Sequence, residues 1–171
     1  MKFFKYLFIV LFLSSCGVTV NYDYENSTDF SKYKSYNFYS DLETGLSDLD
    51  TKRLLRFMDT SLIARGYIKS DYPDFMINIV SSEFQNSNQS NVGVGVGGTG
   101  GNIGGGISIG FPLGQSNTNR EIVFEFVDAK KNSLFWQAVT QRNYNPNNSP
   151  ELREAKLKVI VDKILDGYPP K

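Results

Sequence analysis

Any acid–base chemistry in this chain must rest on carboxylates, hydroxyls or aromatic side chains, because its 171 residues contain no histidine. That absence excludes histidine zinc ligands and Ser-His-Asp triads. The carboxylate candidates are Asp71, Asp74 and Asp128, which lie where predicted loops meet predicted strands. Paired carboxylates can hydrolyse glycosides, but aspartate at the end of a strand usually belongs to a turn. We therefore expect no catalytic residues, with a carboxylate-dependent hydrolase as the least favoured alternative.

Cys16 is the one cysteine of the chain, so neither an internal disulfide nor a cysteine metal cluster can form. It closes the segment Leu13-Ser14-Ser15-Cys16, which resembles the lipobox of bacterial lipoproteins. In that motif the thiol forms a thioether with a diacylglyceryl group before the leader is cleaved. We expect Cys16 to be lipidated and residues 1–15 to be removed. The alternative is an ordinary signal peptide with an incidental cysteine.

The residues before Cys16 have the composition of a signal peptide. Lys2 and Lys5 give a short positive start, and an uninterrupted apolar run follows, centred on residues 8–13. This run is shorter than the roughly 20 residues that cross a bilayer as a helix. We therefore interpret it as the apolar region of a leader that is cleaved from the mature protein.

The charge balance limits which partners the chain can bind. The sequence contains 18 Lys and Arg residues and 18 Asp and Glu residues. No basic excess exists to neutralise the phosphates of a nucleic acid, and no metal or other cofactor is expected. Loss of Lys2 and Lys5 leaves 16 basic against 18 acidic residues, a net charge of −2. Acyl chains must then supply the anchoring. Gly17, by resemblance to enteric sorting signals, favours the outer membrane with the domain facing the periplasm.

Residues 86–119 form a compositional insertion that is first Asn/Gln/Ser-rich and then dominated by glycine. The spacing over Gly104–Gly110 is loosely that of a dinucleotide-binding loop, but Pro112 follows where a helix is required. Alternation predicts either a protruding β-hairpin or a simple extended loop. One face of such a hairpin is the candidate interaction surface for a partner or a bilayer, and it contains Val92, Val94, Val96, Ile107, Ile109 and Phe111.

The remaining sequence predicts the elements that would position these residues. Alternating apolar residues predict strands over residues 18–24, 33–39, 74–84, 120–127 and 134–144. Ser47 and Ser149 are predicted to cap two helices that end at Gly66 and Gly167. Their apolar stripes are Leu54, Leu55, Met58 and Leu62, and Leu157, Ile160, Val161 and Ile164. This order predicts an α+β fold, an antiparallel β-sheet with two helices packed on one face.

Aromatic residues lie on several predicted strands and have two interpretations. Trp136, predicted to share a strand face with Leu134 and Ala138, is expected in the core. The tyrosines are expected at half-buried strand positions, and they are Tyr22, Tyr24, Tyr33, Tyr36 and Tyr39. The same aromatic strands leave open a small-ligand carrier with a groove between sheet and helices. The sequence thus divides into three predicted parts. Residues 1–15 are the leader, residues 16–31 contain the lipidated N-terminus and the first strand, and residues 32–171 form a single domain.

Six ordered segments resemble the domain-of-unknown-function 4136 family of bacterial lipoproteins. They are Val20–Tyr24, Asp29–Phe38, Ala64–Tyr67, Pro73–Phe75, Val127–Lys130 with Leu134–Trp136, and Tyr168–Lys171. The resemblance implies an α+β lipoprotein domain of the cell envelope and assigns no activity. We therefore expect a lipid-anchored, non-enzymatic structural or interaction module that is held to the membrane by acyl chains and contacts other envelope proteins.

Overall fold

The structure is a computed structural model and describes residues 18–85, 118–145 and 147–171. Two long helices and one short 3-10 turn connect or follow its strands. The strands are β1 (Thr19–Tyr24), β2 (Ser35–Phe38), β3 (Ile68–Lys69), β4 (Phe75–Gln85), β5 (Thr118–Asp128) and β6 (Ser133–Tyr144). The helices are α2 (Asp48–Ala64) and α3 (Pro150–Asp166), and the 3-10 turn η2 spans Phe30–Lys32.

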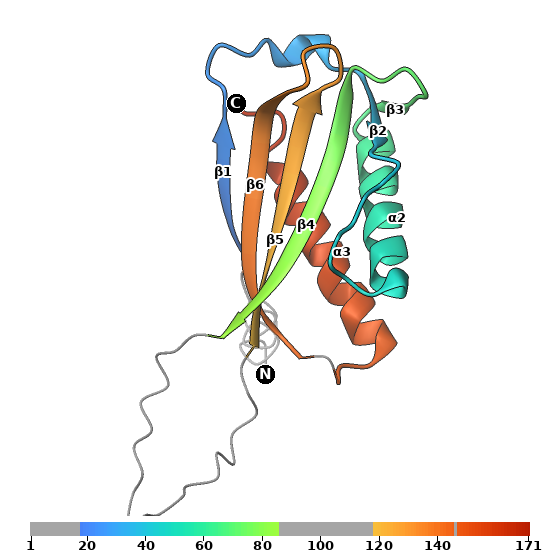
Figure 1. The fold of residues 1–171 in the computed structure, drawn as a ribbon, viewed down its shortest axis with the longest axis vertical. Helices are drawn as coiled ribbons and strands as arrows, with labels where there is room; N and C mark the ends of the chain where they lie inside the picture. Colours follow the sequence, from blue (N-terminus) through green and yellow to red (C-terminus); the bar gives the residue numbers. More distant parts are fainter. Residues whose placement is uncertain (1–17, 86–117, 146) are drawn as a thin grey trace, which may run out of the picture.

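All the described strands belong to one sheet in the order β1-β6-β5-β4-β2-β3, and both helices lie on one of its faces (Figure 1). The predicted α+β class is confirmed. The strands β1, β6, β5 and β4 are antiparallel neighbours, as predicted. The prediction of an antiparallel sheet is wrong at the other edge, where β2 runs parallel to both β3 and β4. The helix α2 separates β2 from β3 and returns the chain to the same end of the sheet, which parallel pairing requires.

Both predicted helix starts are confirmed by their caps. The Ser47 Oγ accepts a hydrogen bond from the Asp50 N–H at 3.3 Å, and the Ser149 Oγ accepts one from the Leu152 N–H at 3.4 Å. These bonds satisfy backbone donors that have no partner inside a helix. After α2, Gly66 has φ +89°, a left-handed conformation that glycine adopts without steric cost.

The two helices bury the predicted apolar stripes against the sheet. The fully or nearly fully buried members are Leu54, Met58, Leu62, Leu157, Ile160, Val161 and Ile164. On the facing strands, Ile77, Ile79, Phe124 and Phe126 are completely buried. This single apolar layer is the core of the described residues.

A β-bulge changes the predicted face assignment at the start of β6. Val127 pairs with Leu134 and Phe126 pairs with Trp136, so Phe135 is an extra residue opposite β5. The extra residue turns Leu134 outward to 47% exposure, while Phe135 and Trp136 are both buried. The prediction that Trp136 lies in the core is confirmed, and the prediction that Leu134 shares its face is wrong.

The predicted tyrosine positions divide into three groups. Tyr33 and Tyr36 are core residues, Tyr39 is half-buried as predicted, and Tyr22 and Tyr24 are each 40% exposed. The Tyr22 hydroxyl donates a hydrogen bond to the Lys163 carbonyl at 2.5 Å, which fastens the edge strand β1 to α3. Its ring lies against the end of that helix, where a Cβ on Gly167 would be 2.3 Å from the ring. Only glycine allows this approach.

The buried stripe of α3 gives a stability prediction. Ile160→Ala should lower the free energy of unfolding by about 2–5 kcal/mol, because it leaves a cavity in the apolar layer. Val159→Ala on the same helix is the matched control, since Val159 is 42% exposed, and should cost less than about 0.5 kcal/mol. Urea unfolding of the purified chain measures both values. Equal effects of the two substitutions would refute this packing.

Candidate functional site

Two sets of predicted site residues, Cys16 and the apolar positions between Val92 and Phe111, lie outside the described residues. The described strands nevertheless fix where their neighbours lie. Thr19 at the start of β1 pairs with Gln141, and Gln141 pairs with Glu121. Gln85 and Thr118, which flank residues 86–117, pair with each other at this same end of the sheet. We call it the N-terminal end of the sheet; the β5–β6 turn and η2 lie at the opposite end (Figure 1).

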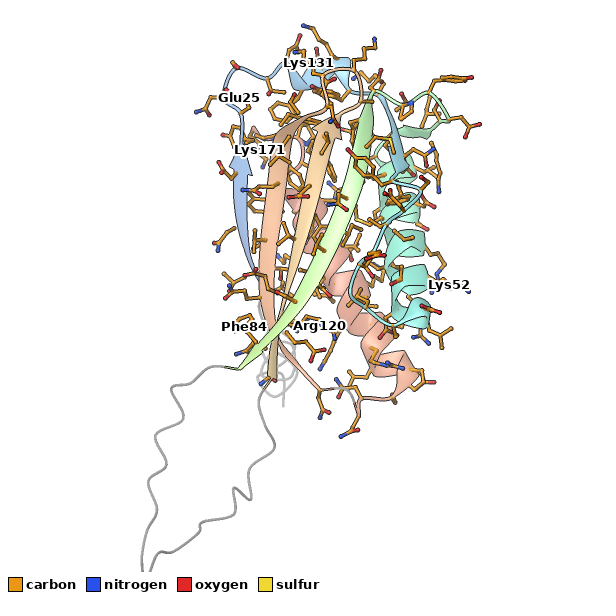
Figure 2. All side chains as sticks on the ribbon, in the orientation of Figure 1. Glu25, Lys52, Phe84, Arg120, Lys131 and Lys171 are labelled. Atoms are coloured by element: carbon orange, nitrogen blue, oxygen red, sulfur yellow. The ribbon has the colours of Figure 1, made fainter. Side chains whose placement is uncertain are left out.

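The predicted carboxylates Asp74 and Asp128 meet at that opposite end. Both line a surface cavity of about 410 Å³, together with Asp29, Lys130 and Lys131. Asp71 is exposed and does not line the cavity. Figure 2 shows Lys131 and Glu25 at this end of the molecule and Arg120 at the other. The structure thus brings two of the three aspartates together.

Asp74 holds the start of β2 against the start of β4. Its Oδ2 accepts hydrogen bonds from the backbone N–H groups of Lys34 and Ser35, each at 2.9 Å, and from the Ser35 hydroxyl at 2.8 Å. Burial alone would raise the pKa of Asp74, but these hydrogen bonds and the nearby charge of Lys130 outweigh it and lower the pKa. Asp74 therefore remains an ionised acceptor.

Asp128 closes the turn between β5 and β6. Its Oδ1 accepts from the backbone N–H groups of Lys130 and Lys131 at 2.9 and 2.8 Å, and its Oδ2 accepts from the Tyr33 hydroxyl at 2.9 Å. Burial would raise its pKa, but these bonds and the charge of Lys131 lower it. The pKa of Tyr33 is raised to about 12 by burial and by Asp128. A carboxyl with a lowered pKa is poorly suited to act as a general acid near neutral pH.

Asp74 and Asp128 thus stabilise a strand start and a turn, the role that aspartate usually has at the end of a strand. Their oxygens are occupied by backbone and side-chain donors that belong to the fold. Among the described residues, no group of three or more acidic or cysteine side chains is placed to hold a metal ion. No helix in the described part of the chain is long and apolar enough to cross a bilayer.

A second feature lies between the sheet and the N-terminal half of α3, at the N-terminal end of the sheet. It is a cleft of about 50 Å³, and its apolar wall is formed by Leu46, Ile122, Leu157 and Ile160. Pockets for drug-sized ligands have volumes of about 300–1,000 Å³. This cleft between sheet and helices is thus too small for a ligand of that size.

Basic residues line the rim of this cleft, which we call the basic cleft. Arg120 from β5, Arg142 from β6, and Arg153 and Lys156 from α3 all contribute to it. Its one acidic residue is Asp50, which is 3% exposed and accepts from Arg53 Nη1 at 2.7 Å and from Arg153 Nη1 at 3.1 Å. Arg120 also pairs with Glu83 on β4.

The basic cleft is not among the sites predicted from the sequence. One signal for it was present in the sequence. Arg120 lies two residues before the inward-facing Ile122, and Arg142 lies two residues after the inward-facing Thr140, so both arginines belong to the inward face of the sheet. A charged residue at an inward position of a strand indicates an end of the core or a site. The contribution of α3 depends on tertiary packing and has no local signal.

The outer face of the sheet is the third surface feature, since no described element covers it (Figure 1). Val80, Val123 and Val139 are paired across three strands and form a short apolar row. Amide–carboxylate pairs flank it, with Asn78 donating to Glu125 at 2.8 Å and Gln141 donating to Glu121 at 2.7 Å. This face therefore carries both apolar and polar side chains.

The fastening role of Asp128 gives a pH prediction. Asp128→Asn should lower the stability at neutral pH by about 1–3 kcal/mol, because it weakens three buried or half-buried hydrogen bonds. The folded-state pKa of Asp128 is lowered, so its contribution is present above the unfolded pKa of about 3.9 and is lost as the pH falls through the folded pKa. The stability difference from the unmodified chain should therefore shrink in acid.

Urea unfolding at a series of pH values measures this difference. The exposed Asp71 supplies the control, since Asp71→Asn should change the free energy of unfolding by less than about 0.5 kcal/mol. A difference between Asp128→Asn and the unmodified chain that stays constant down to the most acid pH would contradict the assigned role.

Comparison with solved structures shows the fold in distant proteins. A PDZ domain protein from Parabacteroides distasonis superimposes with a TM-score of 0.60 at 15% identity, over 90% of this chain and 36% of that one. This chain thus spans little more than a third of that protein. The PelC dodecamer from Paraburkholderia phytofirmans is similar with a TM-score of 0.51 at 11% identity, over 87% of this chain and 95% of that one. These identities establish a shared fold alone.

A comparison with curated proteins finds no significant match. The family model for the domain of unknown function DUF4136 matches residues 20–170. That range contains every described strand and helix apart from the first residue of β1. The resemblance expected from the sequence is confirmed, and the chain belongs to the DUF4136 family.

Proposed function

We propose that this chain is a lipid-anchored lipoprotein of the bacterial cell envelope, attached through Cys16 to the outer membrane and facing the periplasm. The observation that carries the proposal is the sequence Leu13-Ser14-Ser15-Cys16 after an apolar leader. Cys16 precedes the start of β1 at Thr19 by three residues. Three extended residues span about 10 Å, so an acyl group on Cys16 would hold the N-terminal end of the sheet close to the bilayer.

We further propose that the domain acts as a structural or interaction module without enzyme activity. The uncovered face of the sheet supports a contact role. The ionised, hydrogen-bonded states of Asp74 and Asp128 weigh against the hydrolase alternative. The segment that contains the apolar positions between Val92 and Phe111 connects Gln85 to Thr118, which pair at the same end of the sheet as Thr19. These apolar positions therefore remain a second candidate contact with a partner or the bilayer.

The carrier alternative is less well supported. The basic cleft has a volume of about 50 Å³, and a ligand the size of a typical drug or cofactor needs several times that volume. Native mass spectrometry of the purified chain that found a co-purified molecule of that size would restore the carrier hypothesis.

Metabolic labelling with radioactive palmitate tests the anchor. The unmodified chain should be labelled and should sediment with membranes, whereas Cys16→Ala should lose the label because the acceptor thiol is missing. Ser15→Gly is the matched control, since it keeps a small residue before the cysteine and should remain labelled. An unlabelled wild-type chain, or equal labelling of Cys16→Ala, would refute the anchor.

A further inference from the structure

Three buried side-chain donors that line the basic cleft have no hydrogen-bond partner among the described residues. They are the Thr140 Oγ1, the Arg142 Nη1 and the Arg153 Nε. Thr140 is 1% exposed, so its hydroxyl has no access to bulk water. Leaving a buried donor without an acceptor is costly, and more so for a charged group. The basic cleft therefore brings together donors from β6 and α3, and each of them requires an acceptor.

The charges of the cleft make that acceptor an anion. Its lining contains four basic side chains and the single carboxylate of Asp50. Asp50 is already paired with Arg53 and Arg153, and Arg120 is paired with Glu83. Within the described parts of the chain, Arg142 and Lys156 form no ion pair. A local positive excess thus persists, although the mature chain as a whole is weakly acidic.

The size and geometry of the cleft favour a tetrahedral anion. A volume of about 50 Å³ holds a few water molecules, or one group of the size of a phosphate. Arginine donors match phosphate oxygens in pairs, and here basic side chains approach from β5, β6 and α3. Donors that converge from several elements fit a tetrahedral group better than a planar carboxylate, which accepts mainly in one plane.

From these observations we infer that the basic cleft binds a phosphate or phosphodiester group through Arg142, Arg153, Lys156 and the Thr140 hydroxyl. The group can come from a phospholipid headgroup or from free phosphate. The cleft lies at the N-terminal end of the sheet, since Arg142 adjoins Gln141, the partner of Thr19. The lipid source rests on the proposed anchor, which would bring this end to the bilayer; the anion site itself does not.

Isothermal titration calorimetry of the full chain in an uncharged detergent tests the site. The probes are inorganic phosphate, glycerophosphoglycerol (the deacylated headgroup of phosphatidylglycerol) and acetate. Phosphate or glycerophosphoglycerol should bind saturably and more tightly than acetate. Tighter binding of glycerophosphoglycerol assigns the site to a lipid headgroup, and tighter binding of inorganic phosphate assigns it to the free anion.

Substitutions locate the binding. Arg142→Gln and Lys156→Gln should each weaken it about tenfold, which is the loss of one charge-assisted hydrogen bond. Lys156 is half-buried at the rim, so its variant tests the site even if Arg142→Gln disturbs folding. Lys131→Gln removes one positive charge at the opposite end of the sheet (Figure 2) and should bind as the unmodified chain does.

Three results would overturn the inference: no saturable binding of either phosphate probe, acetate binding as tightly as phosphate, or equal affinities in the Lys156 and Lys131 variants. These outcomes are independent of palmitate labelling. Loss of the anion site would leave the anchor intact, and loss of the anchor would leave phosphate binding unchanged.

Discussion

The packing of one sheet face against two helices is the constraint on which the rest of this structure depends. Phe126, Trp136 and Tyr168 lie within 4.5–5.2 Å of one another, measured between ring centroids, at the centre of the aromatic part of this layer. The layer uses the inward positions of β4, β5 and β6, so polar residues are confined to the ends of the sheet and to its outer face. Each of these three regions has its own chemistry.

The two ends of the sheet differ in charge and in what their charged groups do. At the β5–β6 turn, the carboxylates of Asp74 and Asp128 accept hydrogen bonds from donors of the fold itself, so they act there as structural groups. At the N-terminal end, the inward positions of the strands pass from Ile122 and Thr140 to Arg120 and Arg142 where the apolar layer stops. Among the described residues, the donors of Thr140, Arg142 and Arg153 that line the cleft there have no acceptor, which is why this end, adjoining the proposed anchor, is the one we associate with binding.

The elements governed by local rules were predictable from the sequence. The caps at Ser47 and Ser149, the stripes of both helices and the alternation in β4 and β5 all follow from neighbouring residues. The two-residue strand β3 has no apolar pattern, because Ile68 and Lys69 are both exposed. The bulge at Phe135 and the parallel pairing of β2 depend on non-local contacts. The basic cleft was missed for the same reason, since its residues come together only through packing of α3 on the sheet.

The central claim is that an acyl group on Cys16 holds the N-terminal end of the sheet at the membrane. Electron paramagnetic resonance of the acylated chain in vesicles with nickel-chelating lipid headgroups tests it most directly. Cys16 is the one native cysteine and would be consumed by the proposed acylation, so Gln141→Cys and Lys131→Cys each provide a single site for a spin label. The account predicts strong relaxation of the label at residue 141 and weak relaxation at residue 131. Equal relaxation, or the reverse order, would contradict it.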